Sequence, residues 1–307
     1  MEKPFYSFSD YLKKQFGHRV HRISLDAGFS CPNLDGALDS KGCIFCNNKA
    51  FSHFSFTPKM SLEEQISNSI DFYRKRLGVT KYIAYFQAFT NTYSDLDNLR
   101  KNYDVIRNFP EIVGLFISTR PDCIDEEKIK LISDYKKKYL VWLEYGLQTT
   151  HNRILTLVNR HHTYEDFLKA LDLARKHKID TAMHLILGLP GATYQDMMED
   201  AERISHLDTQ GIKFHILQVM KDTPLEKMYN DGAITLLKEE EYVRIICDFL
   251  ERIPSSLVIL RLISTAAASE LIGPLWTQNK QRVLSLVSEE FKRRGTYQGY
   301  RYEGNFN

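Results

Sequence analysis

The sequence predicts an α/β protein, a partial (β/α)6-type TIM barrel of parallel strands with a short C-terminal extension. Short runs rich in β-forming residues alternate with helical patterns along most of the chain, which is typical of parallel strands joined by right-handed crossovers. The pattern provides about seven strands, fewer than the eight of a closed barrel. With 307 residues, 43% of them hydrophobic, the chain can bury a substantial core. We therefore expect one incomplete barrel.

The first strand and the first long helix come before residue 80. Residues 22–25 form the first expected strand. Ser61 and Glu64 can make a capping box, in which each side chain satisfies a free amide of the first helical turn. Apolar residues then recur at helical spacing as far as Gly78, which favours the end of a helix. The β-rich run 82–86 that follows predicts the second strand.

The same cycle of helix and strand continues to residue 262. Apolar residues at helical spacing predict helices around residues 96–106, 129–135, 163–174, 197–207 and 242–249. Runs rich in β-forming residues predict strands at 114–118, 140–145, 182–187, 212–219 and 257–262. Because parallel barrels carry their chemistry at the carboxyl ends of the strands, we expect the functional residues there.

Composition excludes several classes of protein. No apolar run approaches the roughly 18 to 20 residues that a membrane span requires. The first residues, MEKPFYSFSDYLKK, lack the apolar stretch of a secretory signal. We therefore expect a cytoplasmic protein without a membrane partner. The formal net charge of +2 neither requires nor excludes nucleic acid, and no DNA partner is expected.

A basic and aromatic segment lies near residue 300. It combines cations and rings, namely Lys292, Arg293, Arg294, Tyr297, Tyr300, Arg301 and Tyr302. Two interpretations stay open at this point. The segment suits contact with RNA, through stacking and phosphate contacts, or it packs its tyrosines back onto the domain.

Three of the five cysteines lie close together after the first expected strand. Cys31, Cys43 and Cys46 belong to the segment CPNLDGALDSKGCIFC, which its glycines mark as a loop. Thiolates on a pliable loop can converge on one metal centre. The odd number of cysteines and a reducing compartment disfavour a structural disulfide. We interpret Cys247 as a buried structural residue, and Cys123 is either part of a site wall or a bystander.

Three kinds of centre fit these cysteines to different degrees. A structural zinc ion needs four ligands, and His53 is a candidate for the fourth. A thioredoxin-like dithiol leaves Cys31 unexplained. An iron–sulfur cluster held by three thiolates keeps one iron free to bind a small molecule. The spacing alone favours zinc and the cluster equally.

Polar residues collect after the expected strands, beside the cysteine loop. The sequence contains E-x-G-x-Q at residues 144–148, N-R-H-x-T at 159–163 and H-x-x-x-G-L-P-G at 184–191. This ordered succession resembles the radical SAM (S-adenosylmethionine) superfamily. The similar branch holds the elongator catalytic subunit, the oxygen-independent coproporphyrinogen oxidase and the YhcC/YtqA group. The resemblance implies a radical SAM core domain over residues 15–265 and a C-terminal extension over 266–307.

The resemblance also implies the cofactors and the chemistry. Cys31, Cys43 and Cys46 would hold a [4Fe–4S] cluster whose open iron chelates S-adenosylmethionine. An electron from a donor such as flavodoxin or ferredoxin would cleave the cofactor to a 5′-deoxyadenosyl radical, which abstracts hydrogen from the substrate. The cysteine spacing departs from the usual C-x3-C-x2-C, because eleven residues separate Cys31 from Cys43.

The resemblance assigns cofactor contacts by position and leaves the catalytic residues unknown. Ala88, Phe89 and Thr90 replace the glycine-rich turn of the family. The other implied cofactor-binding positions are Ser118, Glu144, Gln148, Arg160, His184 and Val219. Structural roles are the alternative: a buried network for Glu144 and Gln148, an ion pair of Arg160 with Glu165, and ordinary core histidines at His161, His162 and His184.

The substrate is the least determined part of the prediction. The elongator subunit modifies the wobble uridine of tRNA, so the resemblance implies tRNA modification with tRNA as a partner. A small metabolite or a cofactor precursor is the alternative substrate for a radical SAM enzyme. A zinc-stabilised interaction protein without catalysis is the alternative from another class.

Overall fold

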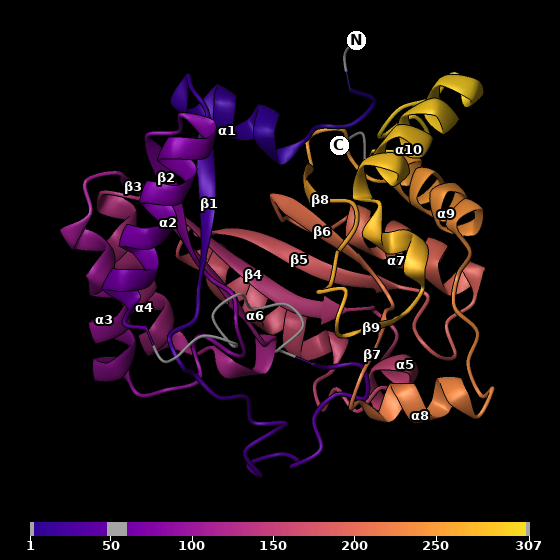
Figure 1. The fold of residues 1–307 in the computed structure, drawn as a ribbon, viewed down its shortest axis with the longest axis horizontal. Coiled ribbons are helices and arrows are strands. Elements are labelled where there is room, and N and C mark those ends of the chain that lie inside the picture. Colours follow the sequence, from indigo (N-terminus) through magenta and orange to yellow (C-terminus); the bar gives the residue numbers. More distant parts are fainter. Residues whose placement is uncertain (1–2, 48–59, 305–307) are drawn as a thin grey trace.

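A single parallel sheet organises the molecule (Figure 1). The computed structural model describes residues 3–47 and 60–304. Seven parallel strands pair in the order β1-β2-β3-β4-β5-β6-β8. Their bounds are β1 Val20–Leu25, β2 Lys81–Phe86, β3 Ile112–Thr119, β4 Leu140–Gln148, β5 Asp180–Leu187, β6 Gly211–Ile216 and β8 Val258–Arg261. Within the described residues β1 and β8 are edges, so the barrel is open and the predicted partial barrel is confirmed.

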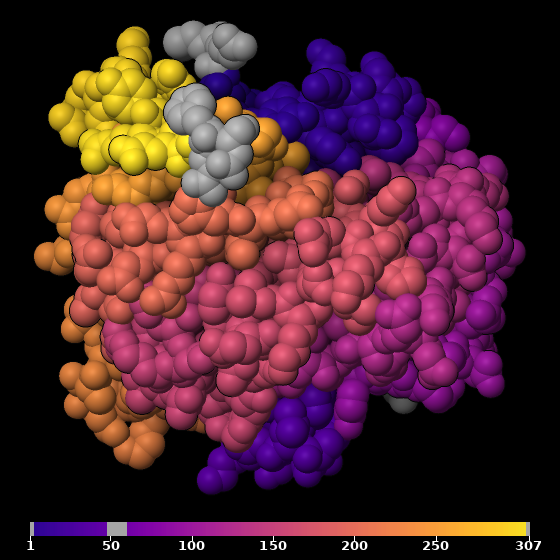
Figure 2. All heavy atoms as spheres, turned by 180° about the vertical axis from the view of Figure 1, so that it is seen from behind, coloured from indigo at the N-terminus to yellow at the C-terminus, as the bar shows by residue number. Residues whose placement is uncertain are grey.

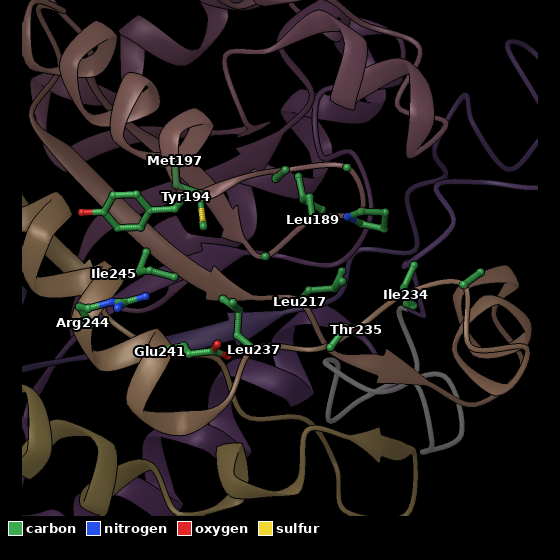
Figure 3. A pocket seen from close by; sticks show the side chains of 15 residues that line it. Leu189, Tyr194, Met197, Leu217, Ile234, Thr235, Leu237, Glu241, Arg244 and Ile245 are labelled. Carbon is green, nitrogen blue, oxygen red and sulfur yellow. The ribbon is translucent and has the colours of Figure 1, made fainter.

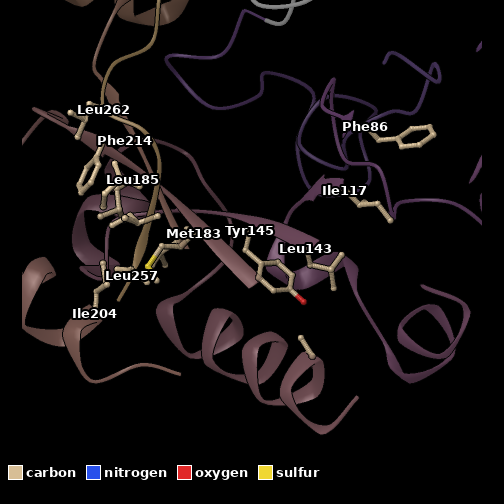
Figure 4. Close-up of a cluster of buried hydrophobic side chains, with 14 of the residues drawn as sticks. Phe86, Ile117, Leu143, Tyr145, Met183, Leu185, Ile204, Phe214, Leu257 and Leu262 are labelled. Carbon is tan, nitrogen blue, oxygen red and sulfur yellow. The ribbon is translucent and has the colours of Figure 1, made fainter. Parts of the chain in front are cut away.

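Helices cover one face of this sheet. They are α2 Leu62–Leu77, α3 Leu96–Asp104, α4 Glu126–Asp134, α6 Tyr164–Lys176, α7 Tyr194–Ser205 and α9 Glu239–Arg252. The expected capping box of Ser61 and Glu64 starts α2, and Gly78 ends it in the left-handed region with φ of 63°. Figure 4 shows the core on this face, where Leu143 and Tyr145 of β4 lie near the neighbouring helices. Burial of this apolar layer stabilises the sheet.

The other face carries an aromatic cluster at the amino ends of the strands. Helix α1 (Phe8–Phe16), which the sequence pattern did not reveal, places Phe8 and Tyr11 against Phe116 and Trp142. The Phe116 and Trp142 rings stack with centroids 5.4 Å apart. Helix α1 also contacts both β1 and β8. It therefore bridges the two open edges and closes the amino end of the half-barrel.

One expected strand is shorter than predicted. The apolar run 212–219 suggested one strand, but β6 ends at Ile216. The chain then forms β7 (Val219–Met220), which pairs antiparallel with β9 (Leu271–Gly273) in a separate two-stranded sheet. Hydrogen bonding to a segment far along the chain decides this break. The other elements that were not expected are α5 Asn152–Leu157, α8 Pro224–Asn230, α10 Lys280–Arg294 and the short 3-10 helices Val105–Asn108, Pro121–Cys123, Tyr135–Lys137 and Leu275–Gln278.

The segment after α10 packs back onto the domain through its backbone, Gln298 and Arg301, whereas Tyr297 and Tyr300, which were expected to pack there in one interpretation, are exposed. Helix α10 contacts α9, and Arg294 bonds Asp248 at 2.6 Å and Glu251 at 3.1 Å. The Gln298 amide donates to the Pro4 carbonyl, so the two ends of the described chain lie side by side, as Figure 2 shows. Within the described residues, no helix is both long and apolar enough to span a lipid bilayer.

Candidate functional site

A polar layer lies on the inner face of the sheet, next to the aromatic cluster. Side chains alternate between the faces of a strand. Trp142 of β4 therefore joins the aromatic cluster, and Glu144, two residues further on, enters the polar layer. A cavity follows at the carboxyl ends of the strands. Among the predicted residues, Cys46, Ser118, Gln148 and His184 line it.

Glu144 is the centre of this layer and is completely buried. Its Oε1 accepts from Arg22 at 2.9 Å, and its Oε2 accepts from Tyr85 and Lys213, both at 2.8 Å. His184 Nε2 lies 2.7 Å from the same oxygen. Burial by itself would raise the pKa of Glu144, but Lys213, Arg22 and His184 outweigh it and hold the pKa well below its usual value. The carboxylate is therefore ionised and fully hydrogen-bonded.

His184 stays neutral in this setting. Burial and the neighbouring Lys213 lower its pKa to about 3, although Glu144 opposes the shift. We assign the ring proton to Nε2, because that nitrogen faces the carboxylate of Glu144. The network predicted as an alternative role for Glu144 therefore exists, and it sits in the wall of the cavity.

The loop between β4 and α6 holds the cysteine loop. Asn159 Nδ2 donates to the Gly42 carbonyl and to Asp39 Oδ2, both at 2.7 Å. In return, Asn33 Nδ2 donates to the Asn159 carbonyl at 2.7 Å. The Ile44 amide adds a bond of 3.2 Å to the Val158 carbonyl. These bonds place Cys43 beside the N-R-H-x-T segment that the sequence singled out.

Arg160 is fixed next to a cysteine. Its Nη2 donates to the Gly146 carbonyl at 2.8 Å and its Nη1 lies 3.6 Å from Cys43 Sγ. Its Nε donates to His162 Nε2 at 2.9 Å. Burial and Arg160 lower the pKa of His162 to about 3, so this ring is neutral and accepts. The alternative pairing of Arg160 with Glu165 is wrong, because Glu165 accepts from Asn152 instead.

The three predicted cysteines approach one another. Cys43 is buried, Cys31 is half-buried and Cys46 is exposed. Local desolvation and the nearby Cys43 and Cys31 thiols raise the pKa of Cys46, and Arg160 opposes the shift. In residues 3–47 and 60–304, no three His, Cys, Asp or Glu side chains are arranged around a single metal ion. A cubane attaches each thiolate to a different iron, so its ligands stand further apart than those of one ion. Three thiols beside an arginine fit such a cluster. His53 lies outside the described residues.

The turn after β2 has the backbone shape of a glycine turn. Phe89 has φ of 61°, in the left-handed region that a bulky side chain rarely adopts. The next amide, of Thr90, donates to the Ser30 carbonyl at 3.1 Å, which ties the turn to the cysteine loop. Ala88 and Thr90 are buried. None of these three residues lines the cavity.

Val219, whose backbone the resemblance places near the cofactor, does not itself line the cavity. Its side chain is buried in an apolar cluster packed against Ile44 and Phe45, and the neighbouring Gln218 lines the cavity instead. Sequence reasoning missed other lining residues, among them Tyr85, Gln87, Lys213, His215, Arg261 and Ser264. The alternation of polar and apolar residues in GIKFHI of β6 was a usable signal for Lys213 and His215.

A second pocket lies between the loop after β5, helix α7 and the segment before α9 (Figure 3). Its walls include Leu189, Leu217 and Leu237, with Tyr194, Glu241 and Arg244 further along. It contains none of the predicted cofactor residues. A Cβ on Gly188 would meet Leu237 Cδ1 at 2.9 Å, and φ there is 80°. This glycine of the G-L-P-G segment therefore shapes a close-packed turn.

The remaining cysteines lie outside the cysteine loop. Cys247 is buried in the core on α9, as expected. Cys123 is buried in the short 3-10 helix between β3 and α4, and it does not line the cavity. His161 is partly exposed and its Nε2 lies 3.4 Å from Asp39.

Neutral burial of His184 predicts a pH-dependent stability. The unfolded chain takes up a proton at this imidazole below pH 6.5, and the folded chain does so only near pH 3. The unfolded state therefore binds more protons in this window, and stability falls with falling pH. The free energy of unfolding should drop between pH 7 and pH 5 by about 2 kcal/mol more in the wild type than in His184→Gln. Urea unfolding at each pH measures this free energy. The exposed His206, replaced by Gln, is the control, and equal slopes for wild type and His184→Gln would contradict the assignment.

Comparison with known proteins places these features in a family. A model described as the Radical SAM superfamily matches residues 40–204, and one described as the Radical_SAM C-terminal domain matches residues 209–293. The chain is 36% identical over 298 residues to the uncharacterized protein YtqA of Bacillus subtilis, covering 97% of this chain and 92% of that protein. It is 32% identical to protein YhcC of Escherichia coli, covering 91% and 90%.

Two further similarities concern proteins with larger chains. A segment is 31% identical over 137 residues to the tRNA uridine(34) acetyltransferase of Methanocaldococcus jannaschii, covering 44% of this chain and 25% of that protein. The structure of Methanocaldococcus infernus Elp3 superposes with a TM-score of 0.68 at 19% identity, covering 91% of this chain and 64% of that one. The Elp3 similarity confirms the fold. On the family match and the YtqA identity, this chain belongs to the radical SAM superfamily of enzymes, which use a [4Fe–4S] cluster and S-adenosylmethionine.

Proposed function

We propose that this radical SAM enzyme acts on tRNA, at the uridine of the wobble position. The observation that carries the proposal is the 31% identity over 137 residues to a tRNA uridine(34) acetyltransferase. Only the radical SAM part of the reaction is proposed for this chain. The cytoplasm is the proposed location, since tRNA is modified there.

The cysteine loop would hold the cluster through Cys31, Cys43 and Cys46. With S-adenosylmethionine bound, the cluster supplies the one-electron chemistry that removes a hydrogen atom from a substrate. Arg160, already anchored on Gly146 and His162, would stabilise thiolate charge at Cys43. Its placement also makes it the candidate for holding the carboxylate of the cofactor.

The cavity residues would bind and orient the cofactor. Gln148 of β4 and His184 of β5 line the cavity together with Cys46. Gln148 has φ of 77°, so the end of β4 bends away from regular strand geometry at this residue. Ser118 lines the same cavity from β3. We assign cofactor contacts to these side chains. The aromatic cluster at the amino ends of the strands would keep water from entering the cavity at that end.

Exposed residues around α10 support contact with RNA. Tyr297 and Tyr300 are exposed by 56% and 54%, although the backbone around them packs back onto the domain. Lys292 and Arg293 are exposed on the neighbouring turn of α10. Aromatic rings that stack on bases, next to cations that meet phosphates, are a common means of binding RNA.

Replacing single cysteines tests the cluster assignment. Cys31→Ala should lose most of the iron and sulfide after anaerobic reconstitution, because two remaining thiolates hold a cubane poorly. Iron analysis and the visible absorbance of the cluster measure the loss. Cys123→Ala and Cys247→Ala remove buried thiols outside the loop and should retain the wild-type iron content. Equal iron in Cys31→Ala and in the wild type would exclude Cys31 as a ligand.

Gly146→Ala tests the roles of Arg160 and Gln148. The added Cβ would lie 2.7 Å from Arg160 Nη2 and 2.9 Å from Gln148 Nε2, so both side chains must move. We expect S-adenosylmethionine to bind at least about tenfold more weakly, with little change in Tm because only side-chain ends are displaced. Gly304→Ala, with a nearest contact of 3.4 Å, is the control. Unchanged cofactor affinity would contradict the proposed contacts.

The tRNA proposal is tested with the reconstituted enzyme. Reduced enzyme, S-adenosylmethionine and unmodified tRNA are incubated together under anaerobic conditions. We expect tRNA to stimulate 5′-deoxyadenosine formation, and mass spectrometry to show a changed anticodon fragment that contains uridine 34. The same tRNA with another base at position 34 is the control. If neither 5′-deoxyadenosine nor the fragment mass responds to tRNA, the substrate is another molecule, and a small metabolite becomes the leading candidate.

A further inference from the structure

A cleft lies at the open edge of the half-barrel, between β1 and β8. Its walls come from the N-terminal segment, β1, β8 and the start of α10, and Figure 1 shows β8 and α10 on the side of the sheet away from α2 and α3. Gln87 and Arg261 line both this edge cleft and the cavity with Cys46. A molecule in the edge cleft would therefore lie directly beside the proposed cofactor.

The edge cleft carries a surplus of positive charge. Its described lining includes no Asp or Glu, and its cations are Lys3, Arg19, Arg22, Arg261 and Lys280. Lys3 is balanced by Asp10 at 3.1 Å, and Arg22 by Glu144 at 2.9 Å. In the described part of the chain, no carboxylate lies within ion-pair distance of Arg261 or Lys280. Arg19 has no ion-pair partner among the described residues either, so three positive charges, those of Arg19, Arg261 and Lys280, are left without an ion pair.

Arg261 has no ion-pair partner among the described residues, although the nearby Glu144 favours its charged form. Its Nη2 lies 2.8 Å from the ring of His215, which is neutral because burial, Arg261 and His184 hold its pKa well below the usual value. Its Nε is buried and has no hydrogen-bond partner among the described residues. Burial lowers the pKa of this guanidinium to about 10, and Arg22 contributes to the shift. A half-buried cation without an ion-pair partner is costly.

Lys280 adds a second cation at the mouth of the edge cleft. It starts α10 and lines the cleft with Arg261. Lys280 is exposed overall. Partial burial and the nearby Arg261 and Arg22 lower its pKa, so the three charges are close enough to repel one another. An anion placed among them would relieve this repulsion and supply the missing counterion.

We propose that Arg261 and Lys280, together with Arg22, bind an oxyanion of the substrate, a phosphate or a carboxylate, in the edge cleft. A guanidinium presents a planar pair of donors that matches either group, and a lysine adds a point charge. Ser24 and Gln87 supply neutral polar groups in the same wall. The unpaired cations of the edge cleft support the oxyanion site whether or not tRNA is the substrate.

Inorganic phosphate and succinate are the probes that test the oxyanion site. Each is titrated at constant ionic strength into the anaerobically reconstituted enzyme, and binding is measured by calorimetry. We expect saturable binding of at least one probe, weakened at least about tenfold in Arg261→Gln and in Lys280→Gln. Lys169→Gln, which removes an exposed lysine from α6 outside the edge cleft, should bind like the wild type. Lys280 is exposed, so its variant gives the answer even if Arg261→Gln does not fold.

Competition separates this proposal from the tRNA proposal. If unmodified tRNA displaces phosphate from the wild type, the oxyanion is a nucleotide phosphate, and this result supports both the oxyanion site and tRNA as the substrate. If phosphate or succinate binds and depends on Arg261 and Lys280 while tRNA does not compete, the oxyanion site stands and the substrate is a small anion. If neither probe binds saturably, or all variants bind equally, the oxyanion site is wrong, whatever tRNA does.

Discussion

The buried negative charge of Glu144 is the constraint on which the inner face of this half-barrel depends. A carboxylate away from water is tolerated only when other groups compensate its charge and fill its hydrogen-bonding positions. Here the partners come from four other strands: Arg22 of β1, Tyr85 of β2, His184 of β5 and Lys213 of β6. Glu144 therefore ties together strands that an open barrel does not close by backbone pairing. Three of these partners, Tyr85, His184 and Lys213, also form the floor of the cavity.

The site above this floor is assembled from loops that hold one another. Asn159 and Asn33 exchange hydrogen bonds between the β4–α6 loop and the cysteine loop. Gly146 lets Arg160 and Gln148 approach the backbone of β4, because any Cβ there would meet both. The long first part of the cysteine loop is thereby anchored at Gly42, next to Cys43. This anchoring holds the loop next to Cys43 in place although eleven residues separate Cys31 from Cys43.

Much of the fold and part of the site were predictable from the chain. Periodic apolar residues and capping signals located the six helices on the outer face, since these signals act within a few residues. Helix α1 was missed although it has local signals: Ser7 caps its first turn, and Gly17 ends it in the left-handed region. The run 212–219 has the composition of one strand, and only pairing with β9 shows that it divides. Lys213 is one of the polar residues that alternate with apolar ones in the β6 sequence GIKFHI, and this alternation could have predicted it as a site residue.

By itself the sequence determined the parallel α/β architecture and the family, and it predicts the three cysteines as ligands, because each of these rests on spacing along the chain. The tertiary structure decided which charges meet. Arg22, Arg261 and Lys280 are far apart in sequence and become neighbours only because β1 and β8 are the edges of one curved sheet. Electrostatic energy depends on distances in space and on burial, neither of which one-dimensional spacing contains.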